Sequence, residues 1–170
     1  MKEVPFKAPW GAPLVLMTVV CTLMCVCLPL PGLMIGLGGA MPPWAASIIV
    51  VVPLLAVVIS AVFMVRGYVL TDTSLIIKRL GWVSRLDLSH LNSVTVDPDA
   101  LPGSLRVFGN GGFFSFTGWF RNKKLGAYRA FATDAKRAVV LRFADKTVVI
   151  TPDDPQKFAA EIKPSASHET

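Results

Sequence analysis

Charged side chains are missing from a long stretch near the start of this chain. Residues 8–65 contain no Asp, Glu, Lys, Arg or His. Within them, the apolar runs 14–37 and 45–65 are each long enough to cross a bilayer, which takes about 20 residues of helix. Residues 38–43 separate the runs, and the paired prolines there cannot continue a helix. The sequence predicts a membrane hairpin over residues 14–65. The lack of ionisable groups at membrane depth excludes a proton or ion pathway.

The turn between the two runs lacks basic residues, whereas Lys2 and Lys7 precede the first run and Arg66 follows the second. Lys and Arg stay on the cytoplasmic side of a membrane. We therefore expect a multi-pass protein of the cytoplasmic (inner) membrane with both termini in the cytoplasm. The alternative is a cleaved signal peptide with an exit at residues 38–40. The first run exceeds the usual apolar length of about 7–15 residues, and a second run follows, which disfavours cleavage.

Cysteine and histidine are scarce. Cys21, Cys25 and Cys27 all lie in the first apolar run, where a zinc site would lack a fourth ligand and a polar setting. We expect them to pack as small apolar side chains. His90 stands alone and His168 lies in a polar tail, so neither predicts a general base. The sequence predicts no metal, no cofactor and no enzymatic activity.

The part of the chain from residue 66 onward is basic, with 15 Lys and Arg against 10 Asp and Glu. Anionic lipid head groups attract such a surface when it is held at a membrane. Nucleic acid is the other general partner of basic domains, but tethering to a membrane disfavours it. The expected partners are the bilayer, other integral-membrane subunits and anionic lipids, and not nucleic acid.

After residue 66 the apolar runs become short and turn residues recur, which is typical of an antiparallel sandwich or barrel. The predicted strands are 68–71, 75–79, 83–88, 94–96, 105–108, 113–120, 127–132, 138–143 and 147–151, with a turn at 109–112. Asp153 and Asp154 predict a helix N-terminus, and Pro155 suits its first turn. The domains are then a loosely ordered tail over 1–13, the hairpin, a domain over 66–163 with one capping helix, and a flexible tail over 164–170.

Small residues recur at helical spacing in both apolar runs. Gly32 and Gly36 are four apart in the first run, and Ala56 and Ser60 are four apart in the second. Such faces let two helices approach closely. Either these residues close the hairpin on itself, or they dock it onto another membrane protein.

Aromatic and basic residues gather in one part of the domain. The aromatic members are Phe113, Phe114, Phe116, Trp119 and Phe120, and the basic members are Arg106, Arg121, Lys123, Lys124 and Arg129. Alternation lets only half of the aromatics face the core, so the rest would cover a partner or the bilayer, unless a twist and a bulge near Gly118 bury them all. The basic residues are either a solvated hairpin tip or a patch for lipid phosphate or an acidic partner.

Three stretches resemble the bacterial pleckstrin-homology (PH) domain families that often follow a pair of membrane spans. They are 68–72 with 75–79 (YVLTD, LIIKR), 109–120 with 125–134 (GNGGFFSFTGWF, LGAYRAFATD), and 148–159 (VVITPDDPQKFA). The resemblance covers nearly all of residues 67–163. It implies a PH-like small barrel or sandwich, and no catalytic residues are carried over because the family shares none.

Two functions are compatible with these features. The first is a non-catalytic accessory or scaffold subunit that stabilises a larger integral-membrane complex, whether respiratory, photosynthetic or secretory. The alternative is a PH-like sensor of anionic lipid head groups at the cytoplasmic face. Two spans already hold the domain at the membrane more firmly than head-group contacts could, which favours the subunit.

Overall fold

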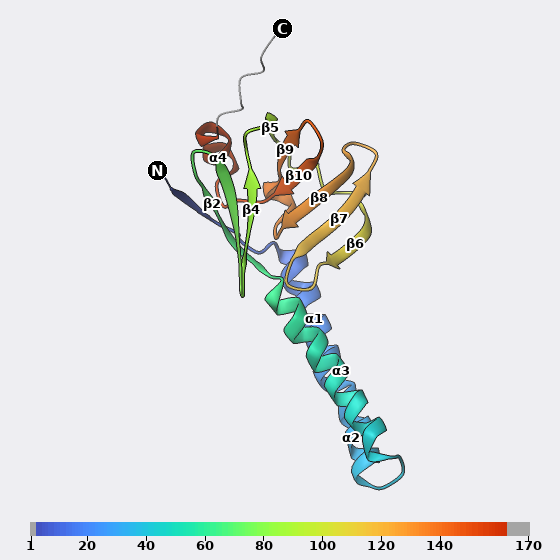
Figure 1. Cartoon of the computed structure of the whole chain (residues 1–170). Helices are drawn as coiled ribbons and strands as arrows, with labels where there is room; N and C mark the ends of the chain where they lie inside the picture. The colour runs from blue at the N-terminus through green and yellow to red at the C-terminus, as the bar shows by residue number, and fades with distance from the viewer. Residues whose placement is uncertain (1–2, 163–170) are drawn as a thin grey trace.

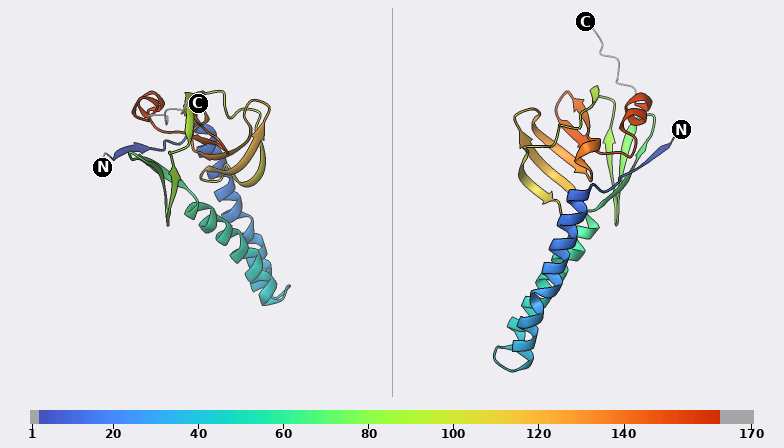
Figure 2. Two further views of the ribbon diagram at one scale, coloured as in Figure 1. Left: turned by 45° about the horizontal axis from the view of Figure 1, so that its top comes forward. Right: turned by 180° about the vertical axis from the view of Figure 1, so that it is seen from behind.

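The computed structural model describes residues 3–162. Figure 1 shows a long helical hairpin that carries, at one end, a domain of two β-sheets with a short C-terminal helix. The two views in Figure 2 agree that the arms of the hairpin run side by side. The predicted tail over 164–170, together with Lys2 and His168, lies outside the described residues.

The first arm of the hairpin consists of α1 (Ala12–Cys27) and α2 (Pro29–Leu37), and the second is α3 (Pro43–Val62). Both arms begin two residues earlier than predicted, because a proline in the first turn has no N–H that would need a partner. The first arm is interrupted at Leu28, since Pro29 cannot donate a helical hydrogen bond. The second arm ends at Val62 and not at residue 65, because Val65 already begins a strand.

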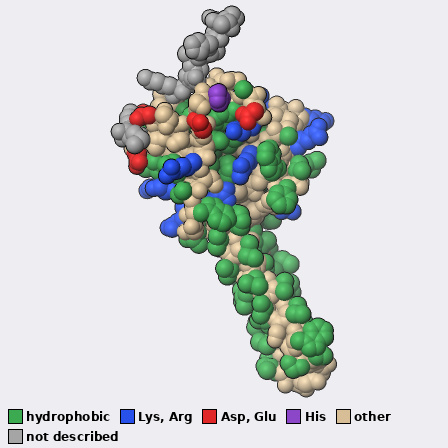
Figure 3. All heavy atoms as spheres, viewed as in Figure 1, with side chains coloured by type: hydrophobic (Ala, Val, Ile, Leu, Met, Phe, Trp, Pro, Cys, Tyr) green, Lys and Arg blue, Asp and Glu red, His purple; other side chains and the backbone are tan. Residues whose placement is uncertain are grey.

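Both arms are long and apolar enough to cross a membrane. Only 17% and 6% of their most apolar 18-residue windows are buried, whereas a core helix of a soluble protein would be mostly buried. Hydrophobic side chains cover the hairpin, and the charged side chains seen in Figure 3 lie on the domain. The 20 residues of α3 extend about 30 Å at 1.5 Å per residue, close to the thickness of a hydrocarbon core.

The first sheet has the strand order β1-β2-β3-β4. Its strands are β1 (Val4–Lys7), β2 (Val65–Leu70), β3 (Ser74–Arg79) and β4 (Val83–Asp87). The prediction of a loosely ordered tail over 1–13 was wrong, because β1 pairs with β2 in antiparallel register. Phe6 in β1 is buried and packs edge-on against Phe158, with ring centroids 5.1 Å apart. Burial of this ring explains why the segment is ordered.

Backbone contacts hold the chain between β1 and α1. The Lys7 N–H donates to Asp153 Oδ1 at 3.1 Å, and the Asp153 N–H donates to the Lys7 carbonyl at 3.0 Å. The Gly11 N–H donates to the Thr133 carbonyl at 3.0 Å, just before α1 begins. The two-sheet domain therefore includes residues that precede the hairpin. The predicted domain of residues 66–163 lacks β1.

The second sheet has the order β5-β9-β10-β8-β7-β6. Its strands are β5 (Leu91–Val96), β6 (Leu105–Gly111), β7 (Phe116–Asn122), β8 (Gly126–Ala132), β9 (Val139–Phe143) and β10 (Thr147–Ile150). The predicted antiparallel pattern fails at β8 and β10, which are parallel. The chain passes from β8 through a 3₁₀ turn at Ala135–Arg137 to β9 and then returns as β10 between them. Of the predicted barrel or sandwich, the structure shows two sheets, which form no closed barrel across residues 3–162.

The hairpin of β6 and β7 differs from its prediction. The predicted turn at 109–112 lies partly within β6, and β7 begins at Phe116 rather than at residue 113. Gly109 and Gly118 face each other across the hairpin with φ of 112° and 142°, a region that favours glycine. A Cβ on either glycine would press on the opposite backbone. The Gly109–Gly118 pair therefore allows β6 and β7 to stay paired through residues where the sequence predicted a turn.

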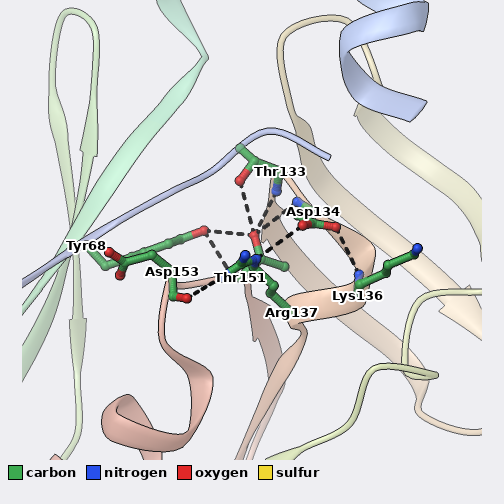
Figure 4. A network of polar contacts seen from close by, with 7 residues as sticks. All are labelled: Tyr68, Thr133, Asp134, Lys136, Arg137, Thr151 and Asp153. Carbon is green, nitrogen blue, oxygen red and sulfur yellow. Dashed lines mark hydrogen bonds and ion pairs between the residues drawn. The ribbon is translucent and has the colours of Figure 1, made fainter. Parts of the chain in front are cut away.

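The core lies between the two sheets and is closed at one end by α4 (Pro155–Glu161). The Asp154 carboxylate caps this helix by accepting from the Lys157 N–H at 2.9 Å. The Asp153 carboxylate does not cap the helix and instead accepts from the Lys7 N–H of β1. Figure 4 shows a polar network that joins the sheets through Tyr68 and Thr151. The Thr151 hydroxyl accepts from the Thr133 N–H at 2.8 Å, and the Thr151 N–H donates to the Tyr68 hydroxyl at 3.2 Å.

Candidate functional site

An exposed apolar edge is the most prominent surface of the domain. Strand β6 is the last strand of its sheet and pairs only with β7 among the described residues. Leu105, Val107 and Phe108 on this strand are 76%, 67% and 75% exposed. Trp119 of β7 lies opposite Phe108 and is 46% exposed. Apolar side chains therefore continue from the free edge onto one face of the sheet.

The five predicted aromatic residues do not form a single patch. Phe120 is buried and stacks on Tyr128, and Phe116 packs against the same cluster on one face of the sheet. Trp119 lies on the opposite face. The bulge that was considered near Gly118 falls in β6, between Arg106 and Phe108.

Phe113 and Phe114 lie in the turn between β6 and β7, next to the helical hairpin. The Phe114 N–H donates to the Thr18 hydroxyl of α1 at 3.1 Å. The ring of Phe114 packs edge-on against Trp10, with centroids 6.1 Å apart. Phe114 therefore attaches the second sheet to the helix, and the Phe113 ring lies against the Phe114 ring with centroids 4.8 Å apart.

The predicted basic residues are also divided. Arg121, Lys123 and Lys124 lie at the turn between β7 and β8, which Figure 1 shows at the end of the domain far from the helices. Lys124 Nζ lies 2.6 Å from Asp97 Oδ2, and this contact holds the pKa of Asp97 below its usual value. Arg106 Nη1 donates to the Gly109 carbonyl at 3.3 Å.

The small residues of the hairpin differ in their surroundings. Gly32 lies against Ile49 of α3, and Gly36 lies against Ala46 so closely that a Cβ on Gly36 would be 2.5 Å from the Ala46 Cβ. These two glycines close the far end of the hairpin. Ala56 is exposed on α3, and Ser60 is half-buried near the domain.

A cavity of about 550 Å³ opens between the two sheets where they meet the helices. Its lining combines residues from the end of α3, from β3 and from the strands β6 to β8. They are Ile59, Ser60, Phe63, Arg79, Arg106, Phe108, Gly109, Asn110, Phe113, Thr117, Gly118, Trp119 and Arg129. No Asp or Glu belongs to this lining.

Arg79 is the residue of this cavity that sequence reasoning missed. It is only 8% exposed, and its Cζ lies 5.8, 5.6 and 5.2 Å from the ring centroids of Phe63, Trp82 and Phe131. Arg129 Cζ lies 4.9 Å from the same Phe131 ring. Burial, and then the neighbouring charge of Arg129, lower the pKa of Arg79. Alternation along β3 was the available signal, because it puts residue 79 on the inward face with Leu75 and Ile77.

Within residues 3–162, no group of three His, Cys, Asp or Glu side chains is placed to hold a metal ion. The three cysteines are free and lie along α1. The prominent sites are therefore a free strand edge and a cationic cavity, both of which suit binding.

An apolar helical hairpin followed by two sheets and one closing helix defines a PH-like protein with candidate membrane spans. Residues 66–166 match the bacterial PH domain family, and the chain belongs to this family. The match confirms the resemblance that the sequence motifs indicated. No curated protein and no solved structure matches the chain significantly. Family membership establishes the PH-like fold and suggests a module that binds lipid or protein, since one fold serves many functions.

Proposed function

We propose that this protein is a non-catalytic, membrane-anchored interaction module that acts as an accessory or scaffold subunit of a larger integral-membrane complex. The complex would be respiratory, photosynthetic or secretory. In this proposal the hairpin crosses the cytoplasmic membrane and both termini lie in the cytoplasm, as the distribution of Lys and Arg indicates. The domain then stands at the cytoplasmic surface and contacts the soluble parts of neighbouring subunits.

The free edge of β6 is the observation that carries this proposal. An edge strand presents unpaired backbone groups, and natural proteins usually protect it with charges, prolines or a covering element. Strand β6 instead exposes three apolar side chains, Leu105, Val107 and Phe108, with Arg106 as its one charge. A protein partner that adds a strand or covers this edge would satisfy the backbone groups and bury the apolar surface.

The hairpin supports the same proposal. Its apolar side chains are largely exposed along both arms, so lipid or other helices must cover them. Gly32 and Gly36 are already occupied by α3. Ala56 remains exposed on α3 and offers a small surface on which a helix of another subunit could pack.

The experiment is copurification of the full-length chain from native membranes in a mild detergent. Val107→Glu places a charge at the free edge of β6, and Thr95→Glu places the same charge at an exposed position of β5, the opposite edge strand of that sheet. We expect the wild type and Thr95→Glu to migrate in a large complex, and Val107→Glu to be released from it. If the wild type always purifies alone as a monomer, the accessory-subunit function is refuted.

A second candidate function is the sensing of anionic lipid head groups. One observation favours it, namely the cavity that holds Arg79 and Arg129 without any acidic residue in its lining. The basic turn at Arg121, Lys123 and Lys124 gives this function little support, because it lies far from the helices (Figure 1).

A further inference from the structure

The charge of Arg79 is buried without a counterion. Its Nε is buried and has no hydrogen-bond partner, and no ion pair of its guanidinium occurs within residues 3–162. Three aromatic rings surround the group and stabilise it by cation–π contacts. Such contacts do not replace hydrogen bonds, and an unpaired buried charge is costly for a fold. The cavity is therefore electrostatically incomplete in the isolated chain.

Arg129 is exposed on β8 and adds a second cation to the lining of the same cavity. Its guanidinium lies over the Phe131 ring that Arg79 also approaches, and the two charges repel each other enough to lower the pKa of Arg79 further. Two cations that share one acid-free cavity favour an anion with several oxygens, because such an anion can accept hydrogen bonds from both. A phosphate group has this property, since planar guanidinium groups match its oxygen geometry.

The position of the cavity indicates where the anion comes from. Ile59 and Ser60 of the last turn of α3, and Phe63 just after it, form one wall. These residues lie where the apolar arm ends and the polar domain begins, which is the level of lipid head groups when the hairpin spans a bilayer. Phe108 and Trp119 supply further apolar lining. A lipid could therefore place its phosphate between the arginines and keep its acyl chains along α3.

We propose that this cavity binds the phosphate of an anionic membrane phospholipid, with Arg79 and Arg129 as the donors to its oxygens. The inference rests on the second candidate function and on the hairpin crossing a membrane. Phe108 belongs to both the β6 edge and the cavity, but Val107 is not part of the cavity lining. A protein that loses its partner on Val107→Glu should therefore still bind lipid, and loss of lipid binding on Arg79→Met should leave the partner bound. A soluble phosphate compound also offers anionic oxygens but cannot use the apolar contacts with α3.

The test measures the thermal unfolding of the full-length protein in a neutral detergent, with and without added lipid. Phosphatidylglycerol supplies an anionic phosphate, phosphatidylcholine supplies a zwitterionic control, and inorganic phosphate supplies the anion without acyl chains. We expect phosphatidylglycerol alone to raise the unfolding temperature of the wild type, because binding to the folded state stabilises it. An equal rise with inorganic phosphate, or no rise with phosphatidylglycerol, would overturn the proposal.

Three variants locate the site. Arg79→Met and Arg129→Gln each remove a donor, and Arg142→Gln removes an exposed arginine from β9 as the control. Native mass spectrometry should show affinity for phosphatidylglycerol about tenfold lower in Arg79→Met and Arg129→Gln, as is typical when a charged hydrogen bond is lost, and unchanged affinity in Arg142→Gln. Equal affinity in all four proteins would refute the site.

A stability measurement separates ligand binding from a purely structural role of Arg79. In the absence of lipid, Arg79→Met should unfold at the same temperature as the wild type or higher, because it removes an unpaired buried charge and keeps the apolar stem. A structural arginine would give the opposite result, namely a lower unfolding temperature without lipid. If that occurs together with unchanged lipid affinity in Arg129→Gln, the proposal fails.

Discussion

The Tyr68 hydroxyl donates a hydrogen bond of 2.5 Å to the carbonyl oxygen of Phe131 and so joins the two sheets. Tyr68 is in β2, three residues after the predicted hairpin ends at residue 65, whereas Phe131 is in β8. The same hydroxyl accepts from the Thr151 N–H (Figure 4). A side chain close to the helical hairpin therefore links the two sheets, and the Phe131 ring lies beneath both arginines of the cavity.

Tyr68→Phe should destabilise the protein by about 1–3 kcal/mol, because the Phe131 carbonyl and the Thr151 N–H would each lose a buried partner. Thermal unfolding in detergent measures the effect. Tyr128→Phe is the matched control, since Tyr128 is equally buried but its hydroxyl donates to the partly exposed Ser104 side chain at 2.7 Å. A larger loss in Tyr128→Phe than in Tyr68→Phe would contradict the central role of the network.

Alkaline pH should weaken the fold through the same hydroxyl. Burial raises the pKa of Tyr68 to about 12, whereas a tyrosine in the unfolded chain ionises near 10. The unfolded state therefore releases its proton first, and the stabilisation is complete below pH 10 and is lost as the pH rises to about 12. Unfolding temperatures of the wild type and Tyr68→Phe should converge over this interval. Parallel curves for the two proteins would show that Tyr68 does not titrate differently in the two states.

The N-terminal strand should be essential for the stability of the domain. Phe6→Ala removes a ring that is 5% exposed and packs on Phe158, so we expect a loss of about 3–5 kcal/mol. Lys7→Ala on the same strand alters an exposed side chain and keeps the backbone contacts with Asp153, so its effect should stay within about 0.5 kcal/mol. Equal effects of the two changes would show that β1 contributes little to the core.

The glycine pair of the β6–β7 hairpin should tolerate no side chain. Gly118→Ala would press a Cβ on the Phe108 carbonyl at a φ of 142° that suits only glycine. We expect a lower unfolding temperature and faster proteolysis at the β6 edge, which also carries the proposed partner surface. Gly81→Ala is the control, because its Cβ would meet only Val62 Cγ1 at an ordinary 3.6 Å. A neutral Gly118→Ala would mean that the strands can separate without cost.

The basic turn of β7 and β8 should contribute little to lipid binding. Lys123→Ala with Lys124→Ala removes two charges at the end of the domain far from the helices (Figure 1). Affinity for phosphatidylglycerol should be unchanged, and loss of the exposed Lys124–Asp97 pair should cost less than about 1 kcal/mol. The same lipid titration as for Arg79→Met checks this. A strong decrease in affinity would move the lipid site to this turn.

The hairpin, most strand positions and the final helix could be predicted because each depends on local patterns. Uncharged runs, paired prolines and alternating apolar residues need no knowledge of distant contacts, and every predicted strand agrees with the structure to within three residues at each end. Residues 1–13 were misjudged because the strand near the N-terminus pairs with β2, beyond the whole hairpin. The parallel pair of β8 and β10 was missed for the same reason, because it requires β9 to lie one strand further away, so that β10 fits between β8 and β9.

The sequence by itself determined that this protein has a long apolar hairpin and a domain of short strands, because hydropathy and short-range alternation are properties of neighbouring residues. The PH-like fold was indicated by the resemblance of three stretches to the bacterial PH domain families. Tertiary structure alone decided that the aromatic and basic residues separate, and that Arg79 and Arg129 share an acid-free cavity beside the end of α3. Those arginines come from strands of different sheets, so their proximity follows from the packing of the sheets and not from their spacing in the chain. Burial without a counterion is likewise a property of the packed state, in which water is replaced by three aromatic rings.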